Sequence, residues 1–77
     1  MERKLYKQLW RTRFEKMLTL EKEGLATYQE LLKDCAKKEN LKQHPVIQIN
    51  LEQVAEDEKR HIKLVEELLA ILDRQPD

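Results

Sequence analysis

The sequence predicts an all-α protein built from two long helices. The 77-residue chain is rich in Leu, Glu and Lys but contains only one glycine and two prolines, a composition that favours helix. Apolar residues recur at helical spacing in two separate stretches. The main break falls at 39–45, where Pro45 suits the first turn of a new helix and disfavours helical geometry at His44. We therefore predict a helix over 5–38, a loop over 39–45 and a second helix over 46–74, folded as an antiparallel hairpin.

Glu21 lies at the centre of the apolar stripe of the first predicted helix. With about 100° of rotation per residue, a set of mostly apolar side chains falls within about 40° of it. These residues are Trp10, Phe14, Met17, Leu25, Tyr28, Leu32 and Cys35. A carboxylate in the middle of a core face is costly unless another group pairs with it. The only glycine, Gly24, weakens this helix and leaves room for close approach of a neighbouring helix.

Glu58 occupies the same kind of position in the second predicted helix. The apolar residues within about 40° of it are Ile47, Leu51, Val54, Ile62, Val65, Leu69 and Leu72. His61 follows three residues later, at about 60° on the same face. Other acids, such as Glu23, Glu30 and Glu67, fall on the opposite faces, where solvent is expected. Their positions on the apolar faces distinguish Glu21, Glu58 and His61 from ordinary charged surface residues.

The chain is short for a self-sufficient domain. A single domain of 77 residues buries limited apolar surface and usually needs a disulfide, a bound metal or a partner chain for stability. The lone cysteine, Cys35, excludes a disulfide within the chain. Further leucines and an isoleucine widen the apolar arc of both helices beyond what a hairpin can cover: Leu9, Leu20, Leu31, Leu64, Leu68 and Ile71. We therefore expect a homodimer or larger homo-oligomer, in which two chains form a four-helix bundle.

The charge balance argues against two classes of partner. Fifteen basic and fifteen acidic residues give a formal net charge of zero, so nothing favours binding to nucleic acid or to a membrane surface. No apolar run approaches the ~20 residues of a membrane span, and the N-terminal residues are too polar for a signal peptide. A cytoplasmic location is the default expectation.

The three polar residues of the core faces suit a metal ion. Glu58 and His61 form a Glu-x-x-His motif, whose two ends share one helix face and can bind one ion. Glu21 can reach the same ion from the other helix or bridge to a second one. Two chains together supply four carboxylates and two imidazoles, the ligand set of di-iron carboxylate bundles. Mixed oxygen and nitrogen ligands favour iron, with manganese or zinc as alternatives.

Two motifs carry a resemblance to a known family. Glu21 and Tyr28 are seven residues apart in the first helix, and the run Ala-Glu-Asp-Glu-Lys-Arg-His ends at His61 in the second. The chain resembles half of a ferritin-like, rubrerythrin-type domain, most closely the two-helix encapsulated ferritins. The resemblance implies that Glu21 bridges two metals, that Glu58 and His61 each bind one, and that Tyr28 lies nearby as a hydrogen-bond partner or electron donor. It also implies a ferroxidase that oxidises Fe(II) for iron storage or detoxification, with an encapsulin nanocompartment as a candidate shell and location.

Other interpretations of the same residues remain open. Glu58 and His61 could form a buried hydrogen-bonded pair without metal, and Glu21 could pair with His61 or a lysine. Tyr28 could simply pack in the core, and Asp57 could either orient a ligand histidine or face solvent. At the level of function, the alternatives are a rubrerythrin-like peroxide reductase, which usually needs paired cysteines that this chain lacks, and a non-catalytic helical adaptor or oligomerisation module.

Overall fold

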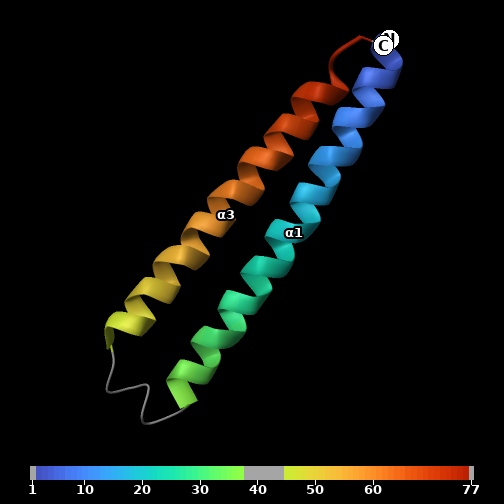
Figure 1. Ribbon diagram of the computed structural model, residues 1–77. Coiled ribbons are helices and arrows are strands. Elements are labelled where there is room, and N and C mark those ends of the chain that lie inside the picture. The colour runs from blue at the N-terminus through green and yellow to red at the C-terminus, as the bar shows by residue number, and fades with distance from the viewer. Residues whose placement is uncertain (1, 38–44, 77) are drawn as a thin grey trace.

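The protein is an antiparallel hairpin of two long helices. The computed structural model describes residues 2–37 and 45–76, with only the backbone described at residues 36 and 37. Helix α1 spans Arg3–Lys37 and helix α3 spans Pro45–Asp73. The two helices run side by side, and both chain ends lie at the same end of the hairpin (Figure 1). The described residues contain no strand, so the prediction of an all-α hairpin is confirmed.

The helix bounds differ from the predicted ones by one or two residues where they fall on described residues. Helix α1 begins at Arg3 because the Glu2 carbonyl already accepts hydrogen bonds from the backbone nitrogens of Leu5 and Tyr6. Helix α3 begins with Pro45 itself, whose missing N–H would be unpaired at a helix start in any case. Most of the predicted loop, together with the predicted helix end at Lys38, lies outside the described residues.

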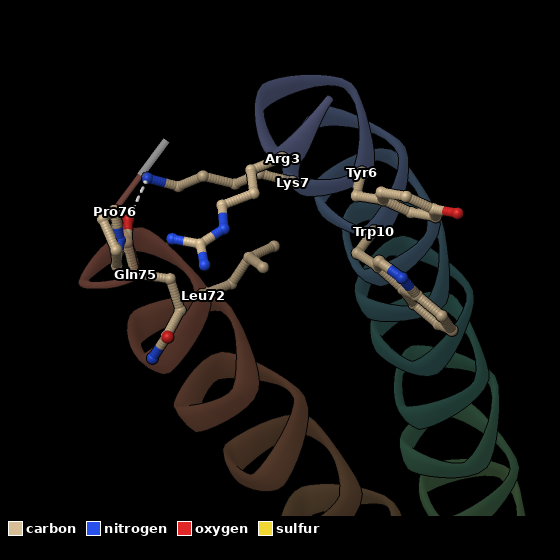
Figure 2. Close-up of a pocket in the computed structure, with 7 residues that line it drawn as sticks. All are labelled: Arg3, Tyr6, Lys7, Trp10, Leu72, Gln75 and Pro76. Atoms are coloured by element: carbon tan, nitrogen blue, oxygen red, sulfur yellow. Dashed lines mark hydrogen bonds between the residues drawn. The ribbon is translucent and has the colours of Figure 1, made fainter. Parts of the chain in front are cut away.

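The open end of the hairpin is tied across the two helices. The Lys7 ammonium of α1 donates to the Gln75 carbonyl at 2.7 Å and to the Asp73 carbonyl at 3.4 Å, as Figure 2 shows for Gln75. Arg11 forms an ion pair with the Asp73 carboxylate. The last carbonyls of a helix lack partners within it and carry partial negative charge, so basic side chains stabilise them. The same end carries an open hollow of about 350 Å³, lined mainly by Arg3, Tyr6, Lys7, Trp10, Leu72, Gln75 and Pro76.

The two helices meet along a seam with a seven-residue repeat. Half-buried or buried residues of α1 recur at alternating intervals of four and three: Lys7, Arg11, Phe14, Leu18, Glu21, Leu25, Tyr28, Leu32 and Cys35. The corresponding residues of α3 are Leu51, Ala55, Glu58, Ile62, Val65, Leu69 and Leu72. This spacing is that of the core positions of a coiled coil. We call these residues the seam. Glu21 and Glu58 therefore occupy positions that a coiled coil normally fills with apolar side chains.

The hairpin is too extended to have an interior of its own. It measures 57 × 14 × 14 Å with a radius of gyration of 17.5 Å, against about 11 Å for a compact domain of this length. Its accessible surface is 6239 Å², whereas a compact monomer of this mass exposes about 5,000 Å². Among the described residues only Cys35, Ala55 and Val65 are buried. Thirteen large apolar side chains of the described residues are still 39% to 65% exposed in a single chain.

One flank of the hairpin is apolar and the other is polar. Each heptad of a coiled coil has two core residues, and the residue directly before the first of them borders the core. In an antiparallel pair, these bordering residues of the two helices lie on the same side of the pair. Here they carry Trp10, Met17, Gly24 and Leu31 from α1 and Ile47, Val54, His61 and Leu68 from α3. We call this the apolar flank. Its five largest side chains, Trp10, Met17, Leu31, Ile47 and Leu68, are each 41% to 44% exposed.

The opposite flank carries polar or charged side chains. Its residues are Gln8, Glu15, Lys22 and Gln29 from α1 and Glu52, Lys59, Glu66 and Asp73 from α3. All eight side chains are polar or charged, as expected of a surface that stays in water. Beyond the apolar flank lie three more exposed apolar side chains, Leu20, Leu64 and Ile71, whereas the exposed Leu5 and Ile49 beside the polar flank lie near opposite ends of the hairpin. This asymmetry identifies the side on which a partner would remove apolar surface from water. Neither described helix contains a stretch apolar enough to cross a membrane.

Candidate metal centre

Glu21, Glu58 and His61 converge at the middle of the hairpin. Each offers one ligand atom, and these three atoms all lie within 4.8 Å of one another. The His61 Nδ1 atom lies 3.7 Å from the Glu21 Oε2 atom, across the seam. Glu21 is near the midpoint of α1, and Glu58 near the midpoint of α3. The structure thus brings together the three residues that the sequence separated from ordinary surface charge.

The cluster opens toward the apolar flank. The Glu21 side chain is 28% exposed and the His61 side chain 55% exposed. Glu21 and Glu58 belong to the seam, whereas His61 is the one polar side chain among the eight positions of the apolar flank. The polar cluster is therefore placed beneath, and partly within, the surface that a partner would cover.

The Glu21 carboxyl perturbs the titration of Glu58. The pKa of Glu58 is raised, first by a hydrogen bond with the Glu21 carboxyl, which needs a proton on one of the two groups. Partial burial and the negative charge of Glu21 raise it further, and the charge of Asp57 adds a smaller effect in the same direction. His61 opposes the shift by favouring the charged form. In the free protein, Glu58 therefore loses its proton less readily than an ordinary glutamate does.

Within residues 2–35 and 45–76, neither carboxylate of the cluster pairs with a lysine or arginine. Elsewhere on α3 acids do have such partners: Glu56 pairs with Lys59 at 3.0 Å, and Asp57 pairs with Arg60. The central acids thus lack the compensation that their neighbours on the same helix receive. A divalent cation would supply it, and the oxygen and nitrogen donors present suit iron, manganese or zinc. The residues therefore fit a metal, although exposed acidic groups also occur without one.

Gly24 borders the cluster on the apolar flank. A Cβ atom at this position would lie 3.8 Å from the Glu58 Oε2 atom and 4.0 Å from its Cδ atom. Gly24 is thus next to the carboxylate as well as to the surface that a partner would cover. The sequence indicated only that this glycine allows close approach of a helix, because its distance from Glu58 depends on how the two helices are aligned.

Tyr28 and Asp57, the other candidate residues of the described helices, lie outside the cluster. Tyr28 is a half-buried seam residue seven positions after Glu21, about 10 Å along the helix axis. Asp57 pairs with Arg60 on its own helix and makes no hydrogen bond to the His61 imidazole. Cys35 is buried in the seam with 6% exposure, in keeping with a small hydrophobic side chain. His44 lies outside the described residues.

No protein-family model, curated protein or solved structure matches the chain. A functional proposal therefore depends on the geometry of this cluster and on the surface around it.

Proposed function

We propose that two copies of the chain form a di-iron carboxylate centre that oxidises Fe(II), for iron storage or detoxification. The observation that carries this proposal is the convergence of Glu21, Glu58 and His61, with ligand atoms within 4.8 Å of one another, in the middle of a mostly apolar seam. Carboxylates in such positions cost stability unless a cation neutralises them. Iron is both the ion that these donors suit and the substrate of the proposed reaction.

The need for two copies follows from the incomplete ligand set. One chain supplies two carboxylates and one imidazole, and two chains supply the four carboxylates and two imidazoles of a di-iron bundle. The cluster opens toward the apolar flank, so a second hairpin packed there would face its own cluster against the first. Because the cluster lies at the middle of both helices, a twofold axis through it lets the two hairpins overlap over their whole length.

Each residue has a definite role in this proposal. The Glu21 and Glu58 carboxylates bind Fe(II) and stabilise the added charge of Fe(III), and His61 adds a nitrogen donor that disfavours Mg²⁺ and Ca²⁺. The apolar flank of the second copy excludes water and strengthens the electrostatic attraction between carboxylates and metal. Tyr28, one heptad from Glu21 along the seam, serves as a hydrogen-bond partner or electron donor at the edge of the centre. An encapsulin shell remains a candidate for housing the product.

A stopped-flow assay of Fe(II) oxidation tests the proposed activity. With dioxygen as the oxidant, we expect absorbance from Fe(III) to rise faster with protein than with buffer alone, and Glu21→Ala to abolish the difference. Oxidation by peroxide alone would favour the rubrerythrin-like peroxide reductase instead. Equal rates with wild-type protein and buffer under both oxidants, together with no metal binding, would favour a non-catalytic adaptor, for which the exposed apolar flank already provides a binding surface.

A further inference from the structure

We propose that Gly24 is a positioning residue, which leaves a gap at the centre of the apolar flank and thereby lets the second copy come close enough to share the metal centre. The inference rests on the proposed function. It concerns a residue that supplies no ligand atom. It explains why the one glycine of the chain stands beside the Glu58 carboxylate.

The surrounding positions define the gap. The α1 positions of the apolar flank carry Trp10, Met17 and Leu31, and Gly24 alone among them has no side chain. The Glu21–His61 pair, and the position of Gly24 next to the Glu58 carboxylate, place Gly24 within about one turn of His61 across the hairpin. The exposed row of large side chains is therefore interrupted at the level of the metal ligands.

Nothing within the hairpin requires a glycine at this position. Gly24 has no positive φ angle, so its backbone conformation is open to any residue. An added Cβ atom would make only ordinary van der Waals contact with Glu58. Glycine in a helix interior is less stable than alanine, so its presence disfavours the helix without helping the hairpin. The space that it leaves is therefore explained by something outside the single chain.

A second copy of this chain is the occupant that the surface favours. The gap lies in the flank whose apolar side chains need covering, next to a ligand set that a second copy would complete. The distance between packed helices depends on the side chains at the contact, and glycine permits the closest approach. Large side chains at this level would hold the two copies apart and lengthen the distance from the carboxylates of one copy to the metal ions shared with the other.

Two substitutions at Gly24 and one matched control test the inference. Gly24→Leu completes the row of large side chains, and Gly24→Ala adds a methyl group for which the single hairpin has room. Ala26→Leu adds a leucine at an exposed position of α1 that belongs neither to the seam nor to the apolar flank. The readouts are Co(II) affinity from optical titration, oligomeric state from sedimentation, and helical melting of the metal-free protein from circular dichroism.

The inference predicts a specific combination of results. Gly24→Ala should melt at a higher temperature than wild type without metal but bind Co(II) more weakly. Gly24→Leu should bind Co(II) at least about 10-fold more weakly, the loss typical of disturbing residues that support metal ligands, while Ala26→Leu binds like wild type. A Gly24→Leu protein that no longer forms dimers would also support the inference, because the added side chain would then keep the two copies apart. If both Gly24 variants bind Co(II) as wild type does, the inference is wrong and the proposed metal centre stands. If wild type itself binds no metal ion, both are wrong.

Discussion

The Glu21 carboxylate of α1 and the His61 imidazole of α3 face each other across the seam, with 3.7 Å between Oε2 and Nδ1. The Glu58 carboxyl completes the group from the turn of α3 next to His61. Two of these three polar side chains, Glu21 and Glu58, occupy seam positions that a coiled coil normally fills with apolar ones. The free protein carries this arrangement at a cost, because the neighbouring Glu21 carboxyl raises the pKa of Glu58 and no lysine or arginine among the described residues pairs with either carboxylate.

Removing either metal ligand of α3 should abolish stoichiometric iron binding. Glu58→Ala removes a carboxylate and His61→Ala removes the only nitrogen donor of the cluster, so neither variant retains the donor set. Equilibrium dialysis followed by metal analysis measures the iron bound per chain. Glu67→Ala is a matched control, because it removes an exposed acid of the same helix away from the cluster. Full binding by either ligand variant would refute the assignment.

The metal-free protein should become more stable when the charge of Glu58 is removed. Its pKa is raised in the folded state, so the folded protein binds this proton more tightly than the unfolded chain does. The resulting stabilisation is fully present below the unfolded pKa, near 4.5, and is lost as the pH rises through the raised folded value. At neutral pH, Glu58→Gln should therefore melt at a higher temperature than wild type.

The same substitution should have a smaller effect at acidic pH, where the wild-type carboxyl is already protonated. Thermal melts of both proteins in a metal chelator, at neutral pH and near pH 4, measure this difference. Lower stability of Glu58→Gln than of wild type at neutral pH would show that the Glu58 carboxylate has a stabilising partner in the free protein.

Metal occupancy should fall as the pH is lowered. The ligands bind metal only when the carboxylates are ionised and the imidazole is neutral, so protons compete with the metal. Free imidazoles and carboxylates take up protons between about pH 7 and pH 4, so bound iron should be released as the pH falls through this range. Desalting at a series of pH values, followed by metal analysis, measures the release. Unchanged occupancy across that range would argue against these ligands.

A charge on the apolar flank should separate the two copies. Leu68 is 41% exposed in a single hairpin and would be covered by a second one, so Leu68→Glu would bury an unpaired carboxylate in the interface. Gln29→Glu adds the same charge on the polar flank and serves as the control. In sedimentation experiments, Leu68→Glu should be monomeric while wild type and Gln29→Glu remain dimeric or larger. Equal association of all three would mean that another surface joins the copies.

The sequence could predict the two helices because each carries a long apolar stripe at helical spacing, broken once near Pro45. It also indicated which acids lie on the stripes, because the angle between Glu58 and His61 follows from helix geometry alone. It could not predict how α1 aligns with α3, since that depends on the packing of both helices along the whole seam. The position of Gly24 next to the Glu58 carboxylate and the placement of His61 on the apolar flank depend on this alignment.

The wide apolar arc was also visible in the sequence, but its division into two unlike flanks was not. That division needs the seven-residue repeat of the seam, which the burial of Glu21 and Glu58 helps to define. Asp57 illustrates a different limit. Its spacing allowed either a contact with a ligand histidine or exposure to solvent, and the structure pairs it with Arg60, a nearby side chain of the same helix.

Native mass spectrometry of the protein with and without Fe(II), kept anaerobic, tests the central claim most directly, because it reports the number of chains and the number of metal ions in one spectrum. We expect dimers, or multiples of dimers, that gain two iron ions for each pair of chains. A single chain that takes up iron without a partner, or an assembly that takes up none, would contradict a metal centre shared between two copies.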